Sequence, residues 1–147
     1  MTPVRELSDE YMAAFIDGEG SIRVRKGSRR PEGWNASYEL TIEVTNTFKP
    51  VLDDIAAKYG GKVSSKKVRN VLLHKPQWVW QLAGTRAADC LKAIRPYLRE
   101  KERQAWLGLE FYAQTSHGGE YRRTGVPPEQ IALREGFYLA LRGMKTS

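Results

Sequence analysis

The chain has 147 residues, of which 41% are hydrophobic and 28% are charged, and these values predict one soluble globular domain. It has no apolar run near the roughly 18 residues of a membrane-spanning helix, and its first residues lack a secretory signal's apolar centre. Cys90 is the only cysteine, which excludes an internal disulfide and a cysteine-based metal site. We therefore expect an intracellular protein, in bacterial or archaeal cytoplasm or in an organelle.

The positive charge is concentrated in one contiguous third of the chain. The formal net charge is +7 and the pI is about 9.6. Residues 21–75 contain 12 lysines and arginines against 5 acidic residues, whereas the rest of the chain contains 12 of each kind. Basic faces that contact only solvent are common, but this uneven distribution favours a surface that binds a polyanion such as nucleic acid.

A short helix is predicted first. Ser8 can cap it, and acidic residues in its first turn suit the positive end of the helix dipole. Apolar residues then recur at helical spacing up to Ile16, and Gly18 and Gly20 end the helix.

The hydrophobic period changes to two after this helix. Ile22 and Val24 alternate with polar and basic residues, as in a strand with one apolar and one basic face. A loop rich in Gly, Pro and Arg follows over residues 26–35. The clearest alternation in the chain then predicts a second strand over residues 38–45.

A second helix is expected to have Thr47 as its cap and Pro50 in its first turn, and to stop at Gly60-Gly61. Two further strands are predicted over residues 62–69 and 77–83.

Helices complete the predicted order. Thr85 is expected to cap a helix that ends near Leu98, a further helix spans about residues 100–113, and a last one spans about residues 129–142. The order α-β-β-α-β-β-α, with helices added at the end, predicts an α+β fold. We expect a single domain over residues 1–147, with a core of about residues 7–109 and a helical extension of about residues 110–147.

The clearest chemical signal is the segment 12–20, Met-Ala-Ala-Phe-Ile-Asp-Gly-Glu-Gly. Its small residues would let a second backbone approach the helix closely. At the helix end, the carboxylates of Asp17 and Glu19 could hold Mg²⁺, which would polarise a phosphodiester and activate water. Alone, this turn would be interpreted as an ordinary helix–strand connection. The preceding helix, the following strand and the basic segment favour the metal site.

Segment 12–20 resembles the LAGLIDADG motif of homing endonucleases, with identity at Ala13, Ile16, Asp17 and Gly20. The sequence departs from the consensus in having Glu19 for the motif's aspartate and alanine for a glycine at position 14.

Two other segments are also similar to the family. Val44-Thr45-Asn46 resembles the end of its second strand, and residues 96–105 resemble its Pro-aromatic-Leu…Lys…Gln-Ala stretch. The similarity covers about residues 7–109. It implies the family's αββαββα fold, in which an antiparallel sheet forms a saddle on DNA.

The resemblance implies roles in metal-dependent cleavage of double-stranded DNA. Glu19 would bind the essential Mg²⁺, or Mn²⁺ or another divalent cation in its place, assisted by the backbone carbonyl of Gly18. Asn46 would position water, and Lys101 would stabilise charge that develops on the phosphate. Lys49 is the best candidate for a basic residue that is common after the amide in the family. No small-molecule cofactor and no membrane partner are expected.

The resemblance also implies a homodimer, because the chain has one motif whereas monomeric relatives have two. The first helices of the two protomers would pack at the centre, and the expected interface residues are Tyr11, Ala13, Ala14, Asp17 and Gly18. Asp17 would stabilise the helix end and the dimer seam rather than bind metal. A symmetric dimer implies a nearly palindromic target, with one phosphodiester cut per strand to leave a short 3′ overhang. Such enzymes are often intron-encoded.

Two sets of residues are expected to contact the DNA. Those that alternate with apolar residues, or lie in the basic strands, are candidates for reading bases in the major groove: Arg23, Arg25, Thr41, Glu43, Lys66 and Gln81. Others are expected to contact phosphates: Arg29, Arg30, Lys62, Lys67, Arg69 and Lys75. Trp78 and Trp80 could stack on bases, but aromatic residues on one strand face are more typical of a core.

Two alternatives remain open. A protein with the LAGLIDADG fold could bind nucleic acid without cutting it, as an intron maturase or a transcription regulator, although Glu19 and Lys101 favour cleavage. An unrelated basic α/β protein that binds RNA could carry the motif by coincidence. A nuclease that uses a histidine-bound metal is excluded, because His74 and His117 are too few and isolated.

Overall fold

The computed structural model describes residues 6–27, 37–66, 75–115 and 125–144. Within these ranges four strands form one antiparallel sheet in the order β1-β2-β4-β3. The strands are β1 (Gly20–Lys26), β2 (Tyr38–Asn46), β3 (Lys62–Lys66) and β4 (Gln77–Ala83). The helices are α1 (Asp9–Glu19), α2 (Lys49–Tyr59), α3 (Gly84–Ile94), the short 3₁₀ helix η1 (Arg95–Tyr97), α4 (Glu102–Thr115) and α5 (Pro128–Met144). The predicted α+β order is confirmed.

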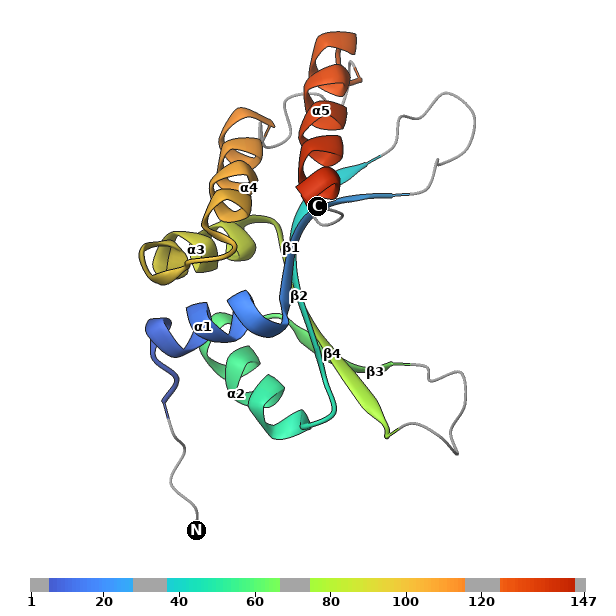
Figure 1. Cartoon of the computed structure of the whole chain (residues 1–147). Coiled ribbons are helices and arrows are strands. Elements are labelled where there is room, and N and C mark those ends of the chain that lie inside the picture. Colours follow the sequence, from blue (N-terminus) through green and yellow to red (C-terminus); the bar gives the residue numbers. More distant parts are fainter. Residues whose placement is uncertain (1–5, 28–36, 67–74, 116–124, 145–147) are drawn as a thin grey trace.

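The helices cover one face of the sheet. In Figure 1 the sheet is seen nearly edge-on, with α1, α2, α3 and α4 on one side and α5 beside the β1 end. Alternate side chains of the strands, including Ile22, Ile42 and Val44, are buried beneath the helices. Trp80 is also buried on this face, where its indole N–H donates to the carbonyl of Gly60 at 2.8 Å. The interpretation of Trp80 as a core residue is therefore confirmed.

Strand register fixes which residues share the helix-free face. Glu43 on β2 lies opposite Ser21 of β1 on one side and Gln81 of β4 on the other, and Lys62 of β3 lies opposite Gln81. Arg23 is two residues along β1 from Ser21 and so lies on the same face. The polar and basic residues that alternate with apolar ones along these strands therefore form one surface.

Two predicted helix caps are wrong. Helix α2 has Phe48 rather than Thr47 at its cap position, and the Asn46 side-chain oxygen accepts the Phe48 N–H at 2.8 Å. Helix α3 begins at Gly84 without a side-chain cap, and the Thr85 hydroxyl hydrogen-bonds to Tyr112 at 2.7 Å instead. Helix α3 also ends at Ile94, before η1, because Pro96 cannot continue its hydrogen bonding.

Helix α5 packs against α4 and β1. Its Glu135 carboxylate accepts hydrogen bonds from the Tyr38 hydroxyl and from Lys26 Nζ, the latter at 2.9 Å. These two donors lower the pKa of the Glu135 carboxyl. Leu141 is buried between the helix and the sheet. Within the ranges that the structure describes, no helix is both long and apolar enough to cross a membrane.

Replacement of Gly61 by alanine should destabilise the protein more than replacement of Gly84. Both glycines have positive φ, at +95° and +67°, and a Cβ at Gly61 would lie 2.5 Å from the Gln81 carbonyl oxygen. A Cβ at Gly84 would meet no atom within 4 Å. Strain alone should lower the free energy of unfolding by about 1–2 kcal/mol in Gly84→Ala, and the clash should raise the loss to about 3 kcal/mol or more in Gly61→Ala. Chemical denaturation measures both values, and equal losses would contradict this close approach of Gly61 to β4.

Candidate functional site

Asp17 joins the end of α1 to the start of α4. Its two carboxylate oxygens accept the backbone N–H groups of Arg99 and Lys101, at 2.8 Å and 3.0 Å. Lys101 is the residue whose carbonyl accepts the first α4 hydrogen bond, from Ala105 at 2.9 Å. Asp17 thus pairs N–H groups that a helix start would otherwise leave unpaired. Each of its oxygens accepts one backbone N–H, so the Asp17 carboxylate stabilises this junction of two helices.

Glu19 is the last residue of α1, and its side chain is exposed. It makes no hydrogen bond or ion pair with any residue of the described ranges. The carboxyl end of a helix is the negative end of its dipole, which favours a nearby cation. The exposed backbone of Gly18 lies beside it. An uncommitted carboxylate in such a position is a suitable ligand for Mg²⁺, which keeps several waters and takes only one or two protein carboxylates.

A metal cage built from one protomer is not present in the described part of the chain. No group of three or more His, Cys, Asp or Glu side chains gathers there in a way that could hold a metal ion. The Glu19 site therefore fits a divalent cation whose remaining ligands come from water and from phosphate oxygens. It does not fit a zinc ion held by four protein ligands.

Lys101 lies beside this helix end although it is far from Glu19 in the sequence. Its ammonium group donates to the backbone carbonyl of Asp17 at 2.5 Å, and the side chain is partly buried. The structure thus places the Lys101 ammonium on the carbonyl of Asp17, which is two residues before Glu19 in the chain. A metal-binding carboxylate and an ammonium group at one place can hold and polarise a phosphate between them.

Asn46 lies at the same end of the sheet as Glu19. Strand β2 continues two residues beyond Val44, which pairs with Gly20 at the start of β1. The Asn46 side-chain oxygen accepts the Phe48 N–H. The side-chain NH₂ of Asn46 has no hydrogen-bond partner among the described residues. Lys49 is different, because its ammonium group forms an i,i+4 ion pair with Asp53 at 2.9 Å. No described contact joins Lys49 to this end of α1.

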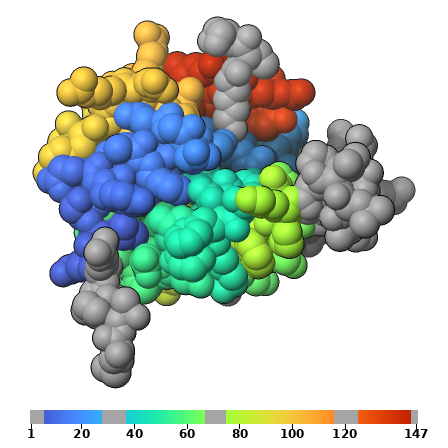
Figure 2. All heavy atoms as spheres, turned by 60° about the horizontal axis from the view of Figure 1, so that its bottom comes forward, coloured from blue at the N-terminus to red at the C-terminus, as the bar shows by residue number. Residues whose placement is uncertain are grey.

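The outer face of α1 carries an exposed stripe of Tyr11, Ala14 and Gly18, spaced at three and four residues. The Tyr11 ring stacks on Phe15, with 6.1 Å between centroids. Ala13 is 0% exposed, so its predicted place in an interface is corrected: one helical step turns it away from Ala14 into the core. Figure 2 shows α1 as an uncovered band between α2 and the residues that begin α4.

The helix-free face of the sheet carries most of the described residues that were predicted to contact DNA. Arg25, Lys62 and Lys66 are exposed there, and Lys75 is exposed just before β4. Thr41 lies on this face but is 2% exposed, and its hydroxyl donates to the Glu39 carbonyl at 3.4 Å. The prediction of Thr41 as a base contact is corrected, because its side chain is covered in this structure. Four predicted contacts lie outside the described residues: Arg29, Arg30, Lys67 and Arg69.

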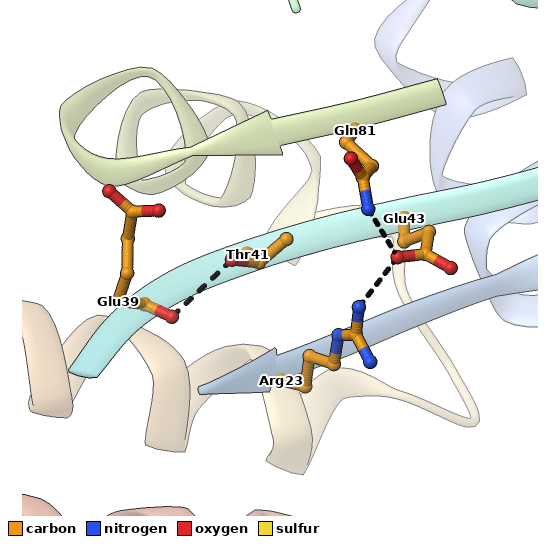
Figure 3. Close-up of polar contacts among 5 residues, drawn as sticks. All are labelled: Arg23, Glu39, Thr41, Glu43 and Gln81. Atoms are coloured by element: carbon orange, nitrogen blue, oxygen red, sulfur yellow. Dashed lines mark hydrogen bonds and ion pairs between the residues drawn. The ribbon is translucent and has the colours of Figure 1, made fainter. Parts of the chain in front are cut away.

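Glu43 is bonded to two neighbouring strands on this face. Its Oε2 accepts from Arg23 Nη2 at 2.7 Å and from Gln81 Nε2 at 2.9 Å, as Figure 3 shows. Sequence reasoning placed all three residues on the face but missed their connection. The sequence did show that Glu43 is an acidic residue among basic strand positions. Only the strand register shows which arginine and which amide side chain it meets.

Comparisons with known proteins give one family and one fold. The family model described as LAGLIDADG endonuclease matches residues 12–105. The structure of the homing endonuclease I-CvuI in complex with DNA has a TM-score of 0.73 and 19% identity, over 92% of this chain and 80% of that one.

Two further solved structures are similar. The archaeal intron-encoded homing endonuclease I-Vdi141I complexed with DNA has a TM-score of 0.72 and 17% identity, over 92% of this chain and 82% of that one. The homing endonuclease I-TnaI has a TM-score of 0.66 and 14% identity, over 97% of this chain and 98% of that one. At these identities the structures show a shared fold. Among curated proteins, none matches this sequence.

Asp17→Ala should lower the free energy of unfolding by about 1–2 kcal/mol, the usual loss for a removed side-chain cap. It would leave the backbone N–H groups of Arg99 and Lys101 without their shared acceptor. Asp17→Asn keeps one acceptor oxygen and should lose less. Urea denaturation measures the three proteins, and an unchanged midpoint in Asp17→Ala would show that this connection does not stabilise the fold.

Proposed function

This chain belongs to the LAGLIDADG endonuclease family, and from that premise we propose that it is a site-specific endonuclease that hydrolyses double-stranded DNA with divalent metal ions. The family match spans the end of α1, the end of β2 and the start of α4. One observation carries the proposal. The Glu19 carboxylate, which has no partner among the described residues, lies at the end of α1, where Asp17 also binds Lys101. The similar I-CvuI structures are complexes with DNA in the presence of magnesium or calcium.

The residues at this helix end divide the reaction between them. Glu19 and the Gly18 carbonyl would hold a Mg²⁺ ion, or Mn²⁺ in its place, which when bound would supply Lewis-acid polarisation of the scissile phosphate and an activated water. The Lys101 ammonium stabilises the negative charge that grows on the phosphate oxygens. The Asn46 amide directs a water toward the phosphorus. Asp17 touches no reacting atom and holds the Lys101 backbone in place.

DNA would lie on the helix-free face of the sheet. The major groove is wide enough for a two-stranded β-ribbon, and this face presents β1 and β2 with their polar side chains outward. The exposed cations Arg25, Lys62 and Lys66 would meet phosphates or base edges. Because β1 begins at Gly20, directly after Glu19, the strand that enters the groove is continuous with the cleavage site.

A homodimer is required for a double-strand cut, since one protomer presents one free carboxylate at one helix end. The exposed stripe of Tyr11, Ala14 and Gly18 supports α1 as the contact, because a Cβ at Gly18 would meet no atom within 4 Å and the backbone is open to close approach. A two-fold axis at this stripe brings two Glu19 residues to the centre. Each then cuts one strand of a nearly palindromic target.

Non-cutting roles, as a maturase or regulator, would use the same sheet face. No observation on the described residues favours them, and a free Glu19 would then have no function. Cleavage of a duplex library with Mg²⁺ separates the two proposals.

Glu19→Gln should abolish Mg²⁺-dependent cleavage while duplex binding survives. Loss of the metal ligand removes several kcal/mol of transition-state stabilisation, which is a fall of about 100-fold or more in the cleavage rate. Asp54→Asn is the matched control, because it removes the same charge from an exposed position on α2 with no described partner. Nicking assays on a selected site measure the rates. Unaltered cutting by Glu19→Gln would exclude Glu19 from the mechanism.

Ala14→Glu should convert the dimer into a monomer and stop double-strand cutting. Two glutamates would face each other across the axis, where like charges and bulk prevent close helix packing. Ala132→Glu, at an exposed alanine on α5, is the control for the added charge. Analytical ultracentrifugation gives the assembly state. A dimer that persists in Ala14→Glu would place the contact elsewhere on the molecule.

A further inference from the structure

Three side chains on the helix-free face form one bonded group, which we call the Glu43 cluster: Arg23, Glu43 and Gln81. They come from β1, β2 and β4, and Glu43 Oε2 receives both hydrogen bonds. The Arg23 side chain is 40% exposed and that of Glu43 is 23% exposed, so both charged groups are partly accessible to solvent.

The stability of the fold does not explain a carboxylate at this position. An ion pair as exposed as that of Arg23 and Glu43 contributes about 0–1 kcal/mol. A negative charge also repels DNA, and the net charge of +7 shows that the chain otherwise favours a polyanion. What the carboxylate does in the structure is hold two partner side chains, and the directions of its two hydrogen bonds show which groups it holds.

The shared oxygen fixes what each partner presents. Gln81 donates its NH₂ to Glu43, which leaves the Gln81 Oε1 as an acceptor. Arg23 donates through Nη2, and its Nε is buried without a hydrogen-bond partner among the described residues. The donors left for a ligand are therefore the remaining N–H groups of Nη1 and Nη2. Glu43 keeps Oε1 as a second acceptor. The cluster thus presents donors at the β1 side and acceptors at the β2 and β4 side.

This order complements one kind of base-pair edge. In the major groove a G·C pair presents two guanine acceptors, N7 and O6, followed by the cytosine N4 amine as a donor. An A·T pair places the adenine N6 amine where guanine has O6, so an arginine donor there would face another donor. The two-donor fork of arginine matches guanine best.

We propose that the Glu43 cluster reads one G·C base pair in each half of the DNA target. Arg23 donates to guanine, and the free Glu43 Oε1 accepts the single cytosine N4 proton that base pairing leaves in the groove, with Gln81 Oε1 as the neighbouring acceptor. Glu43 has a second role as a positioning residue, because it holds the guanidinium and orients the amide before DNA binds. The inference rests on the proposed endonuclease function and specifies part of its substrate.

The experiment is a cleavage-site selection from a randomised duplex library with the full-length protein and Mg²⁺. The unmodified protein should require G·C at one symmetric pair of positions, with a preference of about tenfold or more. Glu43→Gln should lose most of that preference at those positions alone, because the amide can no longer accept at both ends. Arg23→Lys, which keeps the charge but loses the fork, should relax the same base pair.

Glu39→Gln is the matched control. Glu39 lies on the same strand and face, and the change removes the same charge, but no described bond joins its side chain to Arg23 or Gln81. General effects of charge on affinity should therefore be shared by the two variants, while the base preference should change only in Glu43→Gln. Thermal unfolding of each variant checks that it is folded.

Three results would overturn the inference while the proposed function stands. They are an unchanged preference map in Glu43→Gln, an equal change in Glu39→Gln, or relaxation of different base pairs by Glu43→Gln and Arg23→Lys. Failure of the unmodified protein to cut any duplex in the library would instead overturn the proposed function, and the inference with it.

Discussion

The double acceptance of backbone N–H groups by Asp17 is the constraint on which the site depends. It fixes the carboxyl end of α1 against the start of α4, two segments that are far apart in the sequence. Lys101 cannot move away from the end of α1 without breaking its bond to the Asp17 carboxylate and the contact of its ammonium with the Asp17 carbonyl. A charged acceptor of two N–H donors is among the stronger hydrogen-bonding groups in proteins. Asp17 therefore holds the two segments together, while the Glu19 carboxylate makes no bond to the described residues.

Three surfaces meet at the junction of α1 and β1. The exposed stripe of α1 is the proposed dimer contact, Glu19 ends the helix, and β1 carries Arg23 onto the helix-free face four residues later. No loop separates α1 from β1, so a displacement of one of these surfaces would also displace the others. If the Glu43 cluster reads a base pair as proposed, that contact would set where the DNA phosphates meet Glu19.

Periodicity predicted the elements well and their partners poorly. Strict alternation over residues 38–45 defines β2, because a sheet with one covered face requires it. The Asp17 connection could not be predicted from local sequence, since its donors lie more than 80 residues away. Ala13 was assigned to the interface from its size, whereas its angular position on α1 decides its burial. Thr41 has a solvent-side position in the pattern but is covered by its neighbours, which only the packed sheet shows.

In the proposed dimer two Glu19 carboxylates meet the two scissile phosphates across an axis formed by α1. A crystal structure of the protein bound to its selected duplex with Ca²⁺ would show whether they do. We expect two symmetric cation sites, each with Glu19 as a ligand and a DNA phosphate oxygen beside it, and α1 packed against its copy. A single protomer on the duplex, or Glu19 residues remote from the DNA phosphate backbone, would contradict this arrangement.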